Sequence, residues 1–586
     1  MASLSTLVSS GDPQSYPNHP HLRNVGPGTT QLFVDGKPFL ILGGELHNSS
    51  LSSAHYMAEH WARLRDKGHI NTLLGSITWE AIEPVEGAFD FAELDKVVLD
   101  ARQHGLRLVL LWFGSYKNGM STYVPRWIKT DHKRFPRCHV LKAGGVKQTV
   151  EAVSPFSCEV LDADARAFSV LMTHIRELDE EHSTVIMVQV ENEPGLLGDS
   201  RDRSAVANQE FEKPVPVELL KYLASSSTHI AFQERFRAIP DGGQHSWEDV
   251  FGKGTPANEA FMAHHISKFV SHVAAAGKRA YPLPMYTNAW LNADRTSYGK
   301  VPQSGGGGGA GAVSGGISAG SYPSGGAVPH MLDIWRHNCE AVLDFFSPDI
   351  YTSDYLLCLR DYQIAHSSNI LFVPEQRRDA YGCRRLWPAY ARGALGCSPF
   401  GIDTADFGVV DREYKLLSQI QHLLLTTTPR DRLGFFFDEE HEVRMEQERG
   451  GGPSPEIWVH RLGSVEVCVR RAFVFGKTGP GGGMIIHLGG LKFIVAGYGF
   501  NVTFSDPSHD ATFVGLLSVI EKQALASGEL ATLRLLNGDE TRAGNSVNMP
   551  NENPDYGNNP IPVTIPARTG LAEVEIYMLY ESSADI

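Results

Sequence analysis

An α/β fold is predicted for this chain by two patterns that follow one another along the sequence. From about residue 40 to about residue 404, amphipathic helices that end at a glycine alternate with short apolar runs, as in successive βαβ units. From about residue 430, short alternating segments are separated by Gly-rich turns, which is typical of antiparallel sheets. Together these patterns predict a TIM (β/α)8 barrel followed by a smaller antiparallel β-sandwich domain.

The barrel prediction depends on the number of buried strands, because eight parallel strands close such a barrel. A hairpin that turns at Asp35-Gly36 is expected first. Helices are expected at residues 54–67 and 91–104, because apolar side chains recur there at helical spacing and a glycine follows. The apolar runs expected to form the eight strands are residues 40–47, 70–80, 106–116, 184–193, 284–290, 344–351, 370–376 and 398–404.

Three segments divide the 586 residues in this interpretation. Residues 1–30 are expected to be a disordered N-terminal tail, residues 31–430 the barrel domain, and residues 431–586 a β-sandwich accessory domain. A Gly- and Ser-rich run at 303–328 is expected to be a flexible insertion in a barrel loop. Its glycines loosely match a dinucleotide-binding pattern, but no strand leads into them and no helix follows, so we expect no such site.

Composition and charge exclude several classes of partner. The net charge of −15 disfavours a nucleic acid or an anionic membrane, since phosphates attract basic surfaces. We therefore expect a small molecule or an oligosaccharide as the substrate, and the sequence leaves a homo-oligomer open. The seven cysteines have no CxxC spacing, and the polar N-terminus lacks the features of a secretory signal. A cytoplasmic protein with reduced thiols is the expectation.

Two of the expected strands end in glutamate side chains. The apolar run 185–188 leads into Glu191 and Glu193, and the run 370–373 leads in the same way into Glu375. Because a parallel barrel brings the carboxyl ends of its strands to one face, these groups are expected to lie close together. Two carboxyl groups at one site are what a glycoside hydrolase requires.

Several stretches resemble known glycosidases. Asn192-Glu193-Pro194 on the fourth strand and Glu375 on the seventh resemble the acid/base and the nucleophile of the retaining (β/α)8 glycoside hydrolases. The stretch 83–91 is similar to family 42 β-galactosidases. The stretches that resemble glycoside hydrolase family 35, the β-galactosidases, in its branch with an extra β domain, are residues 33–39, 43–47, 79–80, 83–91 and 188–193.

This resemblance implies that residues 31–430 form a glycosidase catalytic domain. A retaining exo-β-glycosidase is expected, with a β-galactosidase as the leading interpretation and a covalent glycosyl-enzyme as the intermediate. A β-glucosidase or a transglycosidase on the same scaffold is the alternative. A catalytically silent sugar-binding protein is a third interpretation. Neither a metal nor a cofactor is implied.

The two glutamates receive different roles in a retaining mechanism, which needs carboxyl groups about 5–5.5 Å apart. We assign Glu375 as the nucleophile and Glu193 as the general acid and then the base. Glu191 is the rival acid, because strand alternation places it on the same face as Glu193. The resemblance favours Glu193, and Glu191 would then form an ion pair with a barrel arginine. Asn192 is expected to bind the sugar 2-hydroxyl.

The remaining candidates are polar or aromatic side chains near strand ends, which can bind hydroxyl groups or stack against sugar rings. Tyr351 is also expected to hydrogen-bond to Glu375. Met120 stands where family 35 enzymes commonly carry a sugar-binding Glu, and a thioether accepts hydrogen bonds poorly, so galactose recognition is less well determined than the chemistry. These candidates are Lys117, Asn118, Glu80, Trp79, Trp112, Trp290 and Tyr351.

Overall fold

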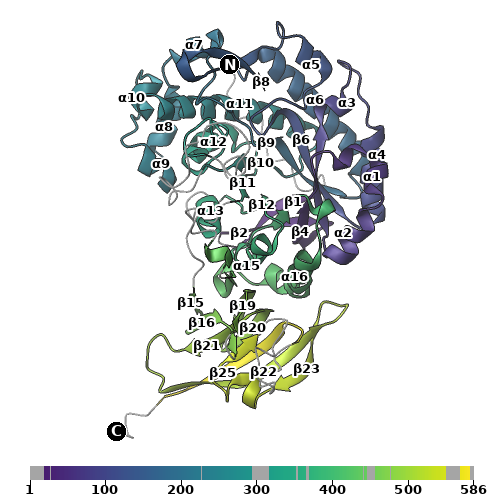
Figure 1. The fold of residues 1–586 in the computed structure, drawn as a ribbon, viewed down its shortest axis with the longest axis vertical. Helices are drawn as coiled ribbons and strands as arrows, with labels where there is room; N and C mark the ends of the chain where they lie inside the picture. Colours follow the sequence, from purple (N-terminus) through teal and green to yellow (C-terminus); the bar gives the residue numbers. More distant parts are fainter. Residues whose placement is uncertain are drawn as a thin grey trace. The chain divides into compact units, whose positions relative to one another are not determined.

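The chain forms two compact units in the computed structural model (Figure 1). We call one the barrel unit (residues 1–66, 70–376 and 398–404) and the other the sandwich unit (residues 67–69, 377–397 and 405–586). The residues that the structure describes are 19–26, 28–225, 228–292, 316–351, 354–363, 369–439, 441–444, 456–474, 477–549 and 568–580.

Eight parallel strands close a barrel, in the order β10-β11-β12-β13-β4-β5-β6-β9. This confirms the predicted TIM barrel. The eighth strand begins two residues earlier than expected and ends at Pro399, because residues 402–404 turn into a 3-10 helix. The barrel strands are β4 (Ile41–Glu45), β5 (Thr72–Thr78), β6 (Arg107–Lys117), β9 (Val185–Asn192), β10 (Met285–Trp290), β11 (Phe345–Ile350), β12 (Val373–Gln376) and β13 (Gly396–Pro399).

Helices connect these strands (Figure 1). The helix expected at 54–67 is two helices, α1 and α2, and an antiparallel hairpin of β7 (Arg137–Leu141) and β8 (Lys147–Val153) follows β6. The helices are α1 (Ala54–Met57), α2 (Trp61–Gly68), α3 (Trp79–Ile82), α4 (Ala92–Gln103), α5 (Arg126–Thr130), α6 (Cys158–Asp179), α7 (Ala205–Phe211), α8 (Val217–Ser225), α9 (Ile230–Arg235), α10 (Trp247–Phe251), α11 (Thr255–Ala280), α12 (Leu332–Cys339) and α13 (Tyr355–Tyr362).

The N-terminal segment is more ordered than the sequence predicts. β1 (His21–Gly26) pairs antiparallel with β2 (Thr29–Val34), so the backbone of residues 21–26 is held by a ladder, and the expected tail to residue 30 is wrong over these residues. Residues 1–18 lie outside the described residues. β2 continues into β3 (Lys37–Phe39) through Asp35 and Gly36, both with positive φ, as the predicted hairpin requires.

The expected insertion at 303–328 falls partly on residues that the structure describes. Residues 303–315 lie outside them. From residue 316 onward the segment makes defined contacts: Leu196 and Ser324 exchange two backbone hydrogen bonds, and the buried Tyr322 donates to Glu259 of α11. Residues 316–328 are therefore held by hydrogen bonds and burial in this structure, and the flexibility expected for the insertion stays a prediction.

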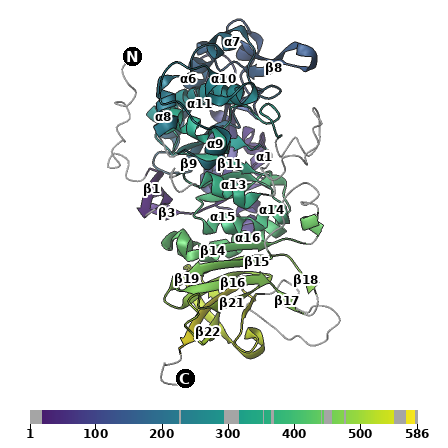
Figure 2. The ribbon, with the colours of Figure 1, turned by 90° about the vertical axis from the view of Figure 1, so that its left-hand side faces the viewer.

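Two antiparallel sheets form the β-sandwich (Figure 2). One contains, in order, β14 (Arg432–Phe437), β19 (Gly481–Gly489), β20 (Lys492–Tyr498), β25 (Leu571–Leu579), β22 (Phe513–Ala524) and β23 (Leu530–Leu536). The other contains β15 (Ile457–Leu462), β16 (Val465–Arg471), β21 (Phe500–Ser505) and β24 (Val547–Met549). The sandwich unit also contains α14 (Ala380–Arg384), α15 (Leu386–Ala391) and α16 (Gly408–Thr426).

Alternate residues of the two sheets share one buried core. Phe435 and Phe437 of β14 lie in the same cluster as Val467 and Val469 of β16. This alternation is the period of two that the sequence shows in this region, and it confirms the predicted sandwich. Among the described helices, none is long and apolar enough to cross a membrane.

Truncation of the sandwich core should destabilise this unit. The Phe435 ring is fully buried and meets Phe500 edge to face, with ring centroids 4.6 Å apart. Phe435→Ala leaves a cavity, so we expect the free energy of unfolding of the sandwich unit to fall by about 3–5 kcal/mol. Urea denaturation of the full chain measures this change. Phe513→Ala is the control, since Phe513 is 47% exposed, and equal losses in the two variants would contradict this core assignment.

Candidate active site

Five barrel strands carry a buried polar side chain at their carboxyl ends. These side chains are Glu45 on β4, Lys117 on β6, Asn192 on β9, Asp349 on β11 and Glu375 on β12. Because the strands are parallel, all five lie at the same end of the barrel, where barrel enzymes place their catalytic groups.

Three carboxyl groups meet at this end of the barrel. Glu193, Asp349 and Glu375 each offer one oxygen that lies within 4.8 Å of the other two. We call these three residues the carboxyl cluster. Asp349 and Glu375 are partners in the register of β11 and β12, and Glu193 follows the last residue of β9. The structure thus brings together the two glutamates that the sequence predicts and adds an aspartate.

Glu375 lies between a phenol and an ammonium group. The Tyr351 hydroxyl donates a hydrogen bond to Glu375 Oε1, as predicted from the sequence. Glu375 Oε2 is buried and receives no hydrogen bond from the described residues. Lys117 interacts more strongly with Glu375 than with the other carboxyl groups. A buried carboxylate with one free oxygen and a nearby ammonium group is suited to act as a nucleophile.

Glu193 is held by its backbone. It has a left-handed conformation (φ +46°), its N–H donates to Asn288 Oδ1 at 2.7 Å, and its carbonyl accepts from the Gly119 N–H at 3.0 Å. Burial, and next the charge of Glu375, raise the pKa of Glu193 to about 7, although Lys117 opposes this shift. A carboxyl group with this pKa can both give and take a proton near neutral pH.

Lys117 supplies a positive charge among these acids. Its Nζ donates to Asn192 Oδ1 at 2.9 Å and lies 4.9 Å from the centre of the Phe113 ring. Burial lowers the pKa of Lys117, but Glu375 and Glu193 outweigh this effect, so the pKa lies above its usual value. The ammonium group therefore stays charged at neutral pH.

Three polar atoms beside the cluster are free to bind a ligand. Asn192 Nδ2, Asn118 Oδ1 and Trp290 Nε1 are buried and have no hydrogen-bond partner among the described residues. The left-handed backbone of Asn118 (φ +53°) donates its N–H to the Asn192 carbonyl at 3.1 Å. Trp290 is the register partner of Asp349. Buried polar atoms without partners are costly unless a ligand or water satisfies them.

Trp79 and Trp112, expected to stack against a sugar, lie instead in the protein core. Both are fully buried. The Trp112 indole donates to Asp164 Oδ1 of α6 at 2.9 Å and its ring contacts Phe168 of the same helix, whereas the Trp79 indole donates to Glu83 Oε2 at 2.7 Å. Trp112 therefore faces the helical layer, and sequence position alone could not distinguish the two faces of β6.

Glu80 lies away from the cluster as well. β5 ends at Thr78 rather than at residue 80, because Trp79 already accepts a helical hydrogen bond from the Glu83 N–H at 3.0 Å and begins α3. The Glu80 side chain is exposed and pairs with Lys129 Nζ at 2.9 Å. It is a surface ion pair, so the structure does not bring it to a ligand.

Glu191 points away from Glu193. Alternation along a regular strand predicts the same face for both, but Glu191 (φ +59°) and Glu193 both leave the extended conformation. Glu191 accepts from the backbone N–H groups of Tyr116 (2.6 Å) and Ser115 (3.3 Å), and its carboxyl group contacts Asp164. The expected ion pair with a barrel arginine is therefore wrong. Burial, and next Asp164, raise the pKa of Glu191 well above its usual value.

Three residues of the site were missed in the sequence. Asp349 Oδ2 accepts from Asn288 Nδ2 at 2.6 Å, so Asn288 joins Asp349 to the Glu193 backbone. Burial, and next Glu375, raise the pKa of Glu45 well above its usual value. Glu45, Asn288 and Asp349 all lie near the carboxyl ends of strands that the sequence predicts. Glu193 and Glu375 were identified as polar side chains at the ends of apolar runs, and the same criterion applies to these three residues.

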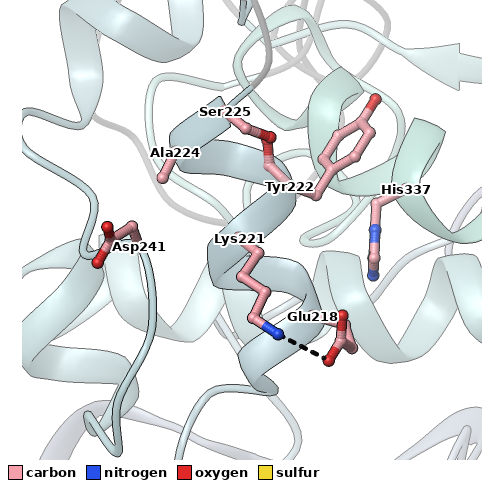
Figure 3. A pocket seen from close by; sticks show the side chains of 7 residues that line it. All are labelled: Glu218, Lys221, Tyr222, Ala224, Ser225, Asp241 and His337. Carbon is pink, nitrogen blue, oxygen red and sulfur yellow. Dashed lines mark hydrogen bonds and ion pairs between the residues drawn. The ribbon is translucent and has the colours of Figure 1, made fainter.

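A shallow depression of about 600 Å³ lies elsewhere on the barrel unit (Figure 3). Its walls come from α8, from the loop at Asp241 and from His337 of α12, and Lys221 pairs with Glu218 within it at 3.4 Å. Because none of its walls is a barrel strand, this depression is separate from the carboxyl cluster.

Comparison with known proteins finds similarity to a beta-galactosidase family over part of the barrel unit. A family model described as beta-galactosidase, that of glycoside hydrolase family 42, matches residues 52–236, and a domain of unknown function (DUF5597) matches residues 410–548. The match is to family 42 rather than to family 35, so the more specific expectation from the sequence is not confirmed. The stretch 83–91 and Glu193 lie inside this match, and Glu375 lies outside it.

Individual relatives are distant. A beta-galactosidase of Xanthomonas manihotis is 27% identical over 201 residues, which are 33% of this chain and 29% of that protein. The chain thus aligns with less than a third of the length of this relative. The beta-galactosidases of Rahnella sp. R3 and of Bacillus circulans sp. alkalophilus have TM-scores of 0.43 and 0.42 and identities of 15% and 14%. Each comparison covers 66% of this chain and 57% of the other.

Replacement of Glu191 by Gln should make stability less dependent on pH. Because the folded-state pKa of Glu191 is raised, its contribution to stability is complete below its ordinary value of 4.5 and is lost as pH rises toward the folded-state value. Gln can still accept from Tyr116 and donate to Asp164, but it cannot ionise. We expect the melting temperature of Glu191→Gln to fall less than that of the wild type as pH rises above about 4.5, measured by thermal unfolding.

Glu80→Gln is the matched control for this measurement, because Glu80 is exposed. It should follow the wild-type curve. If Glu191→Gln also follows the wild-type curve, then Glu191 does not hold a proton in the folded state.

Proposed function

We propose that this chain is a retaining exo-β-glycosidase that releases terminal β-galactosyl residues, with Glu375 as the nucleophile and Glu193 as the acid/base. The observation that carries the proposal is the close approach of these two carboxyl groups, with one oxygen of each within 4.8 Å. A retaining mechanism needs a short separation of this kind, because no water has to fit between nucleophile and sugar.

In the first step, Glu375 attacks the anomeric carbon while Glu193 donates its proton to the glycosidic oxygen. The bond to the leaving group breaks and a glycosyl ester of Glu375 forms. The Tyr351 hydroxyl donates a hydrogen bond to Glu375 and the Lys117 ammonium interacts with it, whereas burial, and next the charge of Glu375, raise the pKa of Glu193 to about 7 so that it can supply the proton.

In the second step, the loss of the Glu375 charge allows Glu193 to act as a base. The ester has no charge, so Glu375 no longer raises the pKa of Glu193. Glu193 then takes a proton from water as the water oxygen attacks the anomeric carbon, and the ester bond breaks. The free Nδ2 of Asn192 is a suitable donor to the sugar 2-hydroxyl, where hydrogen bonds strengthen in the transition state.

The match of residues 52–236 to a beta-galactosidase model supports a galactoside as the substrate. Asn118 Oδ1 and Trp290 Nε1 offer a hydrogen-bond acceptor and a donor to sugar hydroxyl groups. A β-glucoside is the second candidate. Met120 leaves it open, because a thioether does not replace the carboxylate that family 35 enzymes commonly carry at this position.

Loss of the nucleophile should abolish turnover. Wild-type protein is expected to release nitrophenol from the β-galactoside faster than from the β-glucoside, β-xyloside or β-glucosaminide. Glu375→Gln should lower kcat/KM on the best of these by about 10³-fold or more, because an amide cannot form the ester. Glu80→Gln is the control and should keep wild-type rates. A wild-type protein that binds galactose but turns over none of the four glycosides would be a sugar-binding protein instead.

The pH dependence of kcat/KM should report Glu193. The general acid must be protonated, and its pKa is about 7, so kcat/KM should fall as pH rises through about 7. The fall should be steeper for an alkyl β-galactoside than for a dinitrophenyl β-galactoside, because a good leaving group needs little protonation. Steady-state kinetics from pH 5 to pH 9 with both substrates measures this difference. Identical profiles for the two substrates would argue against Glu193 as the acid.

A further inference from the structure

The third member of the carboxyl cluster, Asp349, has no part in the two-glutamate mechanism. It is buried at 3% exposure on β11, and one of its carboxyl oxygens lies within 4.8 Å of a carboxyl oxygen of Glu193. Asp349 Oδ2 accepts from Asn288 Nδ2, whereas Asp349 Oδ1 is buried and receives no hydrogen bond from an N–H or hydroxyl donor among the described residues. An acceptor that faces another acceptor requires a proton between them.

The charges around the cluster decide which group keeps that proton. The charged and acidic groups that act on Asp349 are Glu375, Glu193 and Glu45, together with Lys117 on β6. Lys117 interacts most strongly with Glu375, next with Glu193 and Glu45, and least with Asp349. Asp349 therefore has three acidic neighbours and only a weak interaction with the cation, so its charged form is disfavoured.

Neighbouring phenols do not change this balance. Tyr286, Tyr351 and Tyr362 lie close enough for Asp349 to act on them, and burial raises the pKa of each phenol. They therefore remain neutral and add no charge to the site. Burial, and next Glu375, raise the pKa of Asp349 well above its usual value, which agrees with a retained proton.

We propose that Asp349 is a positioning residue that keeps its own proton throughout the reaction and donates it, as a hydrogen bond, to the carboxyl group of Glu193. This inference rests on the proposed function. When Glu193 has given its proton to the leaving group, the Asp349 hydroxyl stabilises the new carboxylate. When Glu193 takes a proton from water, Asp349 is unchanged. Asn288 fixes the arrangement, since it binds both the Glu193 backbone and the Asp349 side chain.

The pH profile distinguishes this role from a purely structural one. Asp349→Leu removes the donor, which favours the protonated form of Glu193. We expect the basic limb of kcat/KM to move to higher pH by about one unit, with the alkyl β-galactoside as substrate. Asp349→Asn keeps a weaker donor and similar shape, so its limb should move by less than half as much. Asp344→Asn is the matched control, because Asp344 precedes the first residue of the same strand, and its limb should not move.

Two outcomes would overturn the proposal. A limb that moves to lower pH in Asp349→Leu means that Asp349 is ionised in the wild type. A limb that stays in place, with only KM raised, means that Asp349 binds substrate instead of acting through Glu193.

An infrared measurement tests the retained proton without turnover, and it remains available if Asp349→Leu fails to fold. The difference spectrum of wild type minus Asp349→Asn should contain the carbonyl stretch of a protonated carboxyl group, and this band should persist at pH 8, above the titration of Glu193. A difference spectrum with only carboxylate bands would overturn the proposal. Because no substrate is present, this result is independent of whether the chain is a glycosidase.

Discussion

More acidic groups than cations are buried at the carboxyl end of the barrel, and the rest of the site depends on this imbalance of charge. Glu45 and the three groups of the carboxyl cluster are buried around the ammonium group of Lys117. A buried carboxylate is costly unless a cation or hydrogen-bond donors stabilise it, so these groups cannot all be ionised at neutral pH. The protein must therefore distribute a small number of protons over several acids. Catalysis by two chemically identical side chains depends on an unequal distribution of this kind.

Backbone geometry sets that distribution. Parallel strands bring the acids to one end of the barrel, and the left-handed residues Glu191, near the end of β9, and Glu193, just after it, then direct their side chains apart. Glu191 is turned to two N–H groups and Asp164, while Glu193 joins the cluster. A regular strand would have placed both on one face, which would add a further acid to a site already short of cations. The left-handed conformation thus removes an acidic group from the site.

The sequence predicts most of the fold and part of the site. The period of apolar residues predicts all eight barrel strands and the sandwich, because burial determines that pattern directly. Strand ends predict Glu193, Glu375 and Lys117 for the same reason. The rule fails for Trp112, since both faces of a barrel strand are apolar, and for Glu80, since α3 begins one residue earlier. These failures concern the direction of a side chain, which depends on packing across the barrel rather than on local sequence.

Asp349 shows the limit of interpreting a site residue by residue. In the sequence it is one acidic group near the end of an apolar run, and nothing marks it as different from Glu375 on the next strand. Its properties come from three neighbouring residues. The Glu193 carboxyl group can accept a hydrogen bond from it, and Asn288 donates a hydrogen bond that fixes its carboxyl group. Lys117 interacts more strongly with the other acids than with Asp349. A proton held by Asp349 would therefore be a property of the assembled barrel. The same holds for the free atoms of Asn118 and Trp290, which become binding groups only because the fold buries them without partners. Recognition of the sugar is thus expected to depend on these buried atoms, and Met120 need not supply the missing carboxylate if they satisfy the sugar hydroxyl groups.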